Sequence, residues 1–179
     1  MNLYVVESPF QLLCAVEARD YFQLKKQKSI LIVKFSKSKK SNRQLKQIVK
    51  KFKFQKTLFL PFSFSITLND LLLMFLLSYW KLTKKKFNYL ILGEVKNAVV
   101  RSSINNLNHK KNFFLDDGIS TFSVQDKISK NTDLNKVYYE NRYIGTLLVF
   151  FSKILLLDFR NFININWFTC FNINKLSNQ

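Results

Sequence analysis

A chain of 179 residues can bury a core of its own and fits one domain, or one domain with an appendage. With 47% hydrophobic and 16% aromatic residues, the composition excludes intrinsic disorder. The formal net charge of +18 favours anionic partners, such as lipid headgroups, nucleotide sugars, acidic polysaccharides or nucleic acid.

The first half of the chain alternates short apolar strands with helices. After a strand at 3–6, a helix has clear start signals: Ser8 fits the N-cap, Pro9 the first turn and Gln11 the third position of a capping box. Further strands are expected at 30–35, 57–61, 88–92 and 112–116, and helices at 41–53, 68–82 and 97–107. Apolar strands alternating with helices predict an α/β fold, a Rossmann-like parallel sheet with helices on both faces.

The second half is less regular. Residues 119–136 are polar and predict a loop, with a short strand at its start left open. An apolar helix is expected at 142–159 and a final strand at 165–173. We therefore expect a Rossmann-like domain at 1–125, completed by a loop, a helix and a strand within 126–179.

Cysteine usage and apolar runs indicate the compartment. Cys14 and Cys170 lie far apart in apolar surroundings, which is typical of buried thiols in a reducing compartment. No basic residue precedes the first apolar run and Glu7 interrupts it, so we expect no secretory signal. The apolar stretches 71–80 and 144–157 fall short of the ~18–20 residues that a spanning helix needs. A cytoplasmic protein is expected, with peripheral contact at the inner membrane left open.

Acidic and glycine residues gather where the predicted strands end. The acidic residues are Glu7, Glu94, Asp116 and Asp117, the glycines are Gly93 and Gly118, and Ser8 follows the first strand with them. Ligands of parallel sheets bind beyond the carboxyl ends of the strands, so these residues form the candidate site. On motif grounds Asp-Gly suits an ordinary turn as well as a function, and its position favours function. Paired carboxylates on a desolvated strand end suit a general base, so Asp116 and Asp117 are the catalytic candidates. Ser8, Gly93, Glu94 and Gly118 are the substrate-binding candidates.

The sequence lacks the residues that other common catalytic and nucleotide-binding sites require. His109 is the single histidine and precedes the fifth predicted strand, away from the acids, so no Ser-His-Asp or Cys-His arrangement is expected. The sequence contains neither GxGxxG nor GxxxxGK[ST]. Arg101 could bind an anion, but a structural or a solvated side chain is favoured. Capping explains Ser8 adequately, and Glu94 could cap the helix that follows it.

Lysines occur in clusters between the apolar runs, which is typical of solvated loops and helix faces. The basic helix at 41–53 and the turn "KLTKKK" (81–86) predict weak, salt-sensitive binding to anionic vesicles. The sequence has no RNA-binding aromatic motif, zinc spacing or basic zipper, so nucleic acid is the weaker choice of partner.

Three segments, "MNLYVVESPFQLLCAVEA", "YLILGEVKNAVVRSSINNL" and "FFLDDGISTF", together resemble the amino-terminal half of bacterial sialyltransferases and polysialyltransferases. The opening block most resembles the polysialyltransferase-like group that builds surface glycans such as capsules and lipooligosaccharide, and "NWFTCFNI" resembles the segment that ends that half. The resemblance implies a GT-B fold, in which two Rossmann-like domains face a cleft. It places the acidic-acidic-glycine motif on Asp116, Asp117 and Gly118, with Asp117 as the base that deprotonates the acceptor hydroxyl.

In the family, a His-Pro motif and most donor contacts belong to the second domain, and no His-Pro pair occurs in this sequence. We therefore expect a truncated glycosyltransferase without the donor domain. Its family reaction transfers sialic acid from CMP-sialic acid to a glycan acceptor, with no metal or other cofactor, and needs a separate carboxyl-terminal half. The alternatives are a non-catalytic basic α/β domain that binds glycan, anionic membrane or a partner subunit, and a decayed gene fragment.

Overall fold

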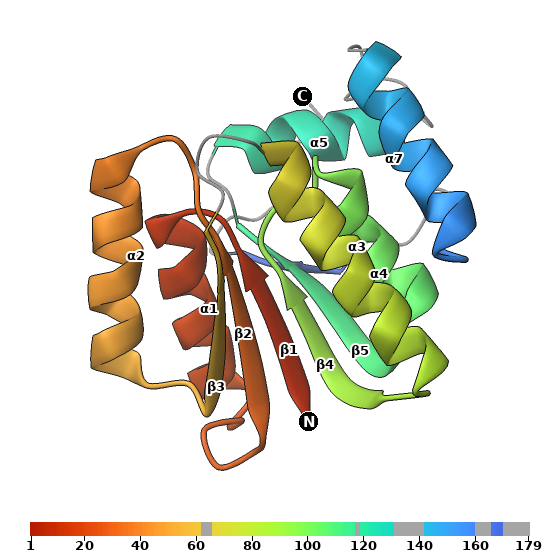
Figure 1. The fold of residues 1–179 in the computed structure, drawn as a ribbon. Coiled ribbons are helices and arrows are strands. Elements are labelled where there is room, and N and C mark those ends of the chain that lie inside the picture. The colour runs from red at the N-terminus through yellow and green to blue at the C-terminus, as the bar shows by residue number, and fades with distance from the viewer. Residues whose placement is uncertain (62–65, 117–118, 131–141, 160–165, 170–179) are drawn as a thin grey trace.

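A six-stranded sheet, with every strand parallel to its neighbours, forms the centre of the molecule (Figure 1). The computed structural model describes residues 1–61, 66–116, 119–130, 142–159 and 166–169. The strands are β1 (Asn2–Val6), β2 (Ser29–Lys34), β3 (Lys56–Leu60), β4 (Lys86–Leu92), β5 (Asn108–Leu115) and β6 (Trp167–Phe168). The helices are α1 (Pro9–Tyr21), α2 (Lys39–Phe52), α3 (Ile66–Leu82), α4 (Ala98–Asn106), α5 (Ile119–Ser129) and α7 (Arg142–Ile154).

The order of the strands is β3-β2-β1-β4-β5-β6. The chain starts at β1 in the middle of the sheet, builds outward through β2 and β3, and then crosses to the other side of β1 to build β4 and β5. This is the strand order of a doubly wound Rossmann-like sheet, whose direction of winding reverses between β1 and β4. Ligands of such sheets bind at that reversal, beyond the carboxyl ends of the strands.

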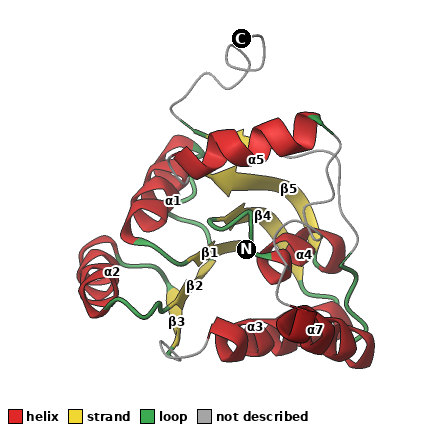
Figure 2. Cartoon of the chain, turned by 90° about the horizontal axis from the view of Figure 1, so that it is seen from above, coloured by secondary structure: helices red, strands yellow, loops and turns green. Residues whose placement is uncertain are grey.

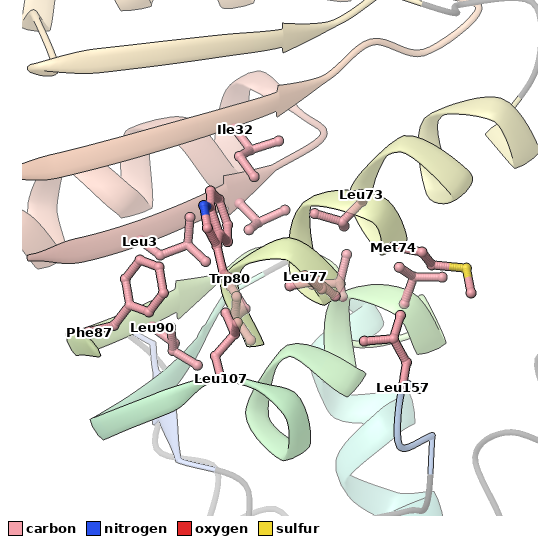
Figure 3. Close-up of a cluster of buried hydrophobic side chains, with 14 of the residues drawn as sticks. Leu3, Ile32, Leu73, Met74, Leu77, Trp80, Phe87, Leu90, Leu107 and Leu157 are labelled. Carbon is pink, nitrogen blue, oxygen red and sulfur yellow. The ribbon is translucent and has the colours of Figure 1, made fainter. Parts of the chain in front are cut away.

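Two apolar layers hold the helices on the sheet. Figure 2 shows α1 and α2 on one face and α3, α4 and α7 on the other. Side chains of a strand alternate between faces, and in β1 Leu3 and Val5 join the layer under α3 and α4, whereas Tyr4 and Val6 join the layer under α1 and α2. Figure 3 shows the first of these layers, in which Trp80 of α3 packs against side chains of β1 and β4. All five residues of β1 are buried, as expected for the central strand of a covered sheet.

The predicted α/β fold and its parallel sheet are confirmed, and most expected strands agree with the structure to within one or two residues. β5 is longer than expected because its polar first half, Asn108–Lys111, pairs with β4. Of the strand expected at 165–173, the structure describes Trp167–Phe168 as strand, and residues 165 and 170–173 lie outside the described part of the chain.

The loop expected at 119–136 was wrong over its first half, where the structure has α5 instead. Polar composition concealed this helix. Val124 is buried in the apolar layer and Thr121 is buried as well, with its hydroxyl bound to a carboxylate. Tertiary contacts of this kind override weak helix propensity. The expected boundary at 125/126 lies within α5, and β6 belongs to the same sheet as β5.

Two further expectations concern the compartment. Cys14 is buried in α1, and Cys170 lies outside the described residues. No helix in the described part of the chain combines the length and the apolar character that crossing a membrane requires.

Candidate functional site

The carboxyl ends of β1, β4 and β5 lie side by side at one edge of the sheet. The pairing aligns Val5 with Leu92 and Leu92 with Phe114. Each of these aligned residues is followed, two positions later, by an acidic residue. These residues are Glu7, Glu94 and Asp116. The fold therefore brings the predicted acidic groups to equivalent positions on three neighbouring strands, beside the point where the winding reverses.

Ser8 caps α1, as predicted. Its Oγ accepts a hydrogen bond from the backbone N–H of Gln11 at 3.1 Å, and Pro9 follows in the first turn. In a capping box the third residue returns a bond to the cap itself. Here the Gln11 Oε1 accepts from the backbone N–H of Glu7 at 2.9 Å, one residue earlier. The Gln11 side chain is thereby fixed at the end of β1.

Gly93 lies where the end of β4 touches the first turn of α1. Its backbone N–H donates to the carbonyl of Val5 at 2.7 Å. A Cβ at this position would lie 2.4 Å from the Gln11 Oε1, 2.8 Å from its Cδ and 3.0 Å from the Val5 carbonyl oxygen. This close approach is sufficient to explain the glycine, which sequence reasoning assigned to substrate binding.

We expect Gly93→Ala to lower the free energy of unfolding by about 1–3 kcal/mol, because the new methyl group overlaps the fixed Gln11 side chain and a strand carbonyl. Urea unfolding followed by tryptophan fluorescence measures the change. Gly145→Ala is the matched control, because Gly145 lies within α7, where alanine is the better helix former. A Gly93→Ala variant as stable as the parent would show that the contact relaxes without cost.

A buried lysine organises the same edge from β2. Lys34 ends β2 with its side chain 2% exposed, and its Nζ donates to the Oε1 of Glu7 and, at 2.7 Å, to the Oδ1 of Asp70. Burial alone would lower the pKa of Lys34, but the charges of Glu7 and Asp70 and their hydrogen bonds outweigh it and raise that pKa above its ordinary value. Lys34 is therefore held as a cation between two carboxylates.

Asp70 extends the cluster to the next helix. Its Oδ1 also accepts from the Nδ2 of Asn97 at 2.9 Å, and the Oδ1 of Asn97 accepts from the backbone N–H of Val100 at 3.0 Å to cap α4. We call Glu7, Lys34, Asp70 and Asn97 the switch-point network, because they join β1, β2, α3 and α4 where the winding reverses. Asp70 is 6% exposed, whereas Glu7 is 26% exposed and reaches the surface.

Sequence reasoning missed three members of this network. One signal was present: Lys34 stands in the apolar run "ILIVKF" of a covered strand, and a lysine is almost never fully buried without a partner. Asp70 and Asn97 give no comparable local signal, because they come from distant parts of the chain.

Asp116 lies buried directly after β5. It is 1% exposed, its Oδ1 accepts from the Oγ1 of Thr121 at 2.8 Å and its Oδ2 accepts from the Oγ1 of Thr169 at 2.9 Å. Its backbone N–H donates to the carbonyl of Phe168 at 3.1 Å. The carboxylate thus ties β5 to α5 and to the residue after β6. Asp117 and Gly118 lie outside the described residues.

The remaining candidates have local structural roles. Glu94 accepts the backbone N–H of Lys96 with its Oε1 at 3.0 Å, and Asn97, not Glu94, caps α4. The buried Arg101 donates from Nη1 to the carbonyls of Val95 and Lys96 at 2.7 and 2.9 Å, which supports its predicted structural role. His109 lies near the start of β5, at the opposite edge of the sheet from the acids.

Among the described residues, no three His, Cys, Asp or Glu side chains gather closely enough to hold a metal ion. Comparisons of the chain with protein-family models, with curated proteins and with solved structures give no match. Function must therefore be inferred from the residues of this chain.

Proposed function

We propose that this chain is the acceptor-side domain of a sialyltransferase-like glycosyltransferase that acts in bacterial surface-glycan synthesis, with CMP-sialic acid as the donor. The observation that carries the proposal is the position of the acids. In a chain of charge +18, Glu7, Glu94 and Asp116 follow three neighbouring parallel strands at the ligand-binding edge of a Rossmann-like sheet. The resemblance of the "FFLDDGISTF" block to bacterial sialyltransferases supports the same assignment.

In the proposed reaction, Asp117 accepts the proton of an acceptor hydroxyl as its oxygen bonds to the anomeric carbon of sialic acid. The bond between that carbon and the phosphate oxygen breaks, and CMP leaves. Asp116 acts through position: its contacts with Thr121 and Thr169 fix the strand end from which the next residue continues. The groups that hold CMP and protonate the departing phosphate would belong to a second Rossmann-like domain.

The switch-point network suits the acceptor side of such a site. Two carboxylates share one ammonium group, so Glu7, Lys34 and Asp70 together carry an excess of one negative charge. Carboxylate oxygens accept hydrogen bonds from hydroxyl groups and repel phosphate. The exposed part of Glu7 therefore fits the hydroxyls of a sugar better than it fits a nucleotide.

A second candidate is a non-catalytic domain that binds glycan without transferring it. It is favoured by a specific observation: Ser8, Gly93, Glu94 and Asp116 each have a local structural role, as a cap, a close contact, a turn and a brace. In a domain that binds glycan without transferring it, these four residues would need no catalytic role besides their structural ones.

Reconstitution separates the two candidates. The chain is incubated with CMP-sialic acid and with galactosyl- or sialyl-terminated acceptors, alone and with the carboxyl-terminal half of a full-length bacterial polysialyltransferase. We expect transfer only when that half is present, because donor and acceptor must be held together for reaction. Binding of acceptor, measured by calorimetry, without transfer under any condition would support the glycan-binding domain. The absence of both acceptor binding and sialyl transfer would contradict both candidates.

A further inference from the structure

Four segments that lead from a helix into the following strand, taken together with the first residues of that strand, share an unusual composition. Residues 22–28, 53–56, 83–86 and 107–111 contain no acidic residue and no arginine. Their ten lysines are Lys25, Lys26, Lys28, Lys53, Lys56, Lys84, Lys85, Lys86, Lys110 and Lys111. In sequence these lysines are separate clusters, each typical of a solvated loop.

The topology brings these segments to one place. All strands are parallel, and α1, α2, α3 and α4 each return the chain to the start of the next strand, so these four connections lie at the amino ends of the strands, the lower edge in Figure 1. Nine of the ten lysines are exposed, and Lys85 lies over the ring of Trp80 at 5.2 Å. We call this surface the basic edge. The candidate acids Glu7, Glu94 and Asp116 lie at the opposite, carboxyl edge.

Large apolar side chains are exposed beside the lysines 84–86. Leu82 at the end of α3 is 70% exposed, and Leu156, just after α7, is 68% exposed. Tyr79 and Ile154, one turn or less earlier on the same helices, are exposed as well. We call Tyr79, Leu82, Ile154 and Leu156 the apolar corner.

Hydrogen bonds hold the two halves of the apolar corner together. The Oγ of Ser78 in α3 donates to the carbonyl of Leu155 at 3.0 Å, and the Nζ of Lys81 donates to the carbonyl of Leu156. The corner is therefore a fixed part of the fold. Lys81 and Lys153 add further positive charge around it.

We propose that the basic edge docks on the surface of an anionic phospholipid bilayer, with the apolar corner at the boundary between headgroups and acyl chains. Lysines near a membrane surface are attracted to anionic headgroups, and exposed apolar side chains next to them gain by leaving water. The docked orientation turns the carboxyl edge, with the candidate site, away from the lipid.

Two other occupants fit this surface less well. A nucleic acid would be met by arginine forks and exposed stacking rings, whereas the four segments contain no arginine, and of their rings Phe22 and His109 are half-buried and Phe54 is buried. A second copy docked through the same edge would set ten lysines against ten lysines, and like charges at an interface oppose association. The anionic bilayer complements both the charge and the apolar corner.

The sequence predicts that helix 41–53 and the "KLTKKK" turn both contribute to binding of anionic vesicles. In the fold, the first turn of that helix and the "KLTKKK" turn lie at opposite edges of the sheet. α2 begins after β2 ends, so its first turn, with the exposed Lys39 and Lys40, lies at the carboxyl edge. The turn at 81–86 lies at the basic edge. A bilayer that contacts one edge leaves the other edge outside the contact.

A pair of charge variants tests the edge. Lys84→Gln/Lys86→Gln and Lys39→Gln/Lys40→Gln each remove two positive charges, at opposite edges. Cosedimentation with phosphatidylcholine vesicles, with and without phosphatidylglycerol, measures binding. We expect the basic-edge variant to bind phosphatidylglycerol vesicles about tenfold more weakly or worse, and the control to change by less than about twofold. Equal losses in both variants, or equal binding of the parent to both kinds of vesicle, would overturn the proposal.

A second variant tests the apolar corner. Leu156 has a φ of 53°, a left-handed conformation that asparagine adopts more readily than leucine, so Leu82→Ser/Leu156→Asn should keep the fold, as circular dichroism checks. We expect its vesicle binding to fall about tenfold and to vanish at high salt, where the parent retains part of its binding. Undiminished binding would contradict insertion of the corner. A dimer that this variant dissociates, or tighter basic-edge binding of duplex DNA than of vesicles, would replace the bilayer with another occupant.

Discussion

The Lys34→Met variant should lose about 3–5 kcal/mol of unfolding free energy, because the substitution removes one partner of a buried ion pair and leaves the other charge without compensation. Methionine fills the volume of the lysine stem, so the lost unfolding free energy comes mainly from the missing charge and not from a cavity. Asp70 is 6% exposed, and its carboxylate would keep Asn97 as a partner but lose the ammonium group. Urea unfolding at neutral pH measures the loss.

Removing the orphaned charge should recover much of that loss. We expect Lys34→Met/Asp70→Asn to be more stable than Lys34→Met alone, since replacing a buried charge pair by neutral groups is often nearly neutral. Glu7→Gln should cost less than Lys34→Met, because Glu7 is partly exposed and water can replace part of its contact. A Lys34→Met variant within about 1 kcal/mol of the parent would show that the network contributes little to stability.

The pH dependence of this difference has a definite sign. The folded-state pKa of Lys34 lies above its ordinary value of 10.5, so its contribution to stability is fully present below pH 10.5 and is lost as the pH rises through the folded-state pKa. The stability gap between the parent and Lys34→Met should therefore stay constant from neutral pH to about pH 10 and narrow only above 10.5. A gap that closes near neutral pH would show that Lys34 is neutral in the fold.

The architecture could be predicted because its signals are local and repeated. Each covered strand is a short apolar run and each helix shows periodic apolar residues, so the parallel sheet follows from the alternation. α5 could not be predicted in this way. The hydroxyl of its buried Thr121 donates a hydrogen bond to Asp116, which lies outside the helix, and no property of residues 119–129 predicts that contact.

The candidate site was predictable in position and less so in role. The rule that parallel sheets bind ligands at their carboxyl edge selected Glu7, Glu94 and Asp116, and the structure places them after three neighbouring strands. It could not reveal that Lys34 crosses to Glu7 and Asp70, because that contact joins residues 27 and 36 positions apart. The basic edge is a similar case, because its lysines can be recognised as one surface only when the strand order is known.

The basic edge and the candidate site lie at opposite ends of the strands, and this separation bears on both proposals. Ten lysines lie at the amino ends of the strands, and the acids of the candidate site lie at the carboxyl ends. A bilayer held at the basic edge would leave the carboxyl edge open to a second domain and to a glycan. Membrane docking and glycosyl transfer therefore use different residues, and loss of either one leaves the other testable.

The largest effect on activity is expected from Asp117→Asn in the reconstituted enzyme. The amide keeps the shape of the side chain but cannot accept the acceptor proton, and a general base contributes about 10²–10⁴-fold to rate. We expect sialyl transfer to fall by about that factor, with acceptor binding retained. Initial rates at saturating CMP-sialic acid, together with calorimetric binding of the acceptor, measure the two quantities separately.

The neighbouring carboxylate supplies the matched control. Asp116→Ala leaves the hydroxyls of Thr121 and Thr169 without their common acceptor, so we expect it to lower the unfolding free energy by about 1–3 kcal/mol. Asp116→Asn keeps one acceptor oxygen and should lose less stability than Asp116→Ala, and less activity than Asp117→Asn. If instead Asp116→Asn abolishes transfer while the fold stays intact and Asp117→Asn is active, then the two aspartates exchange roles, and the brace formed with the two threonines orients the base itself.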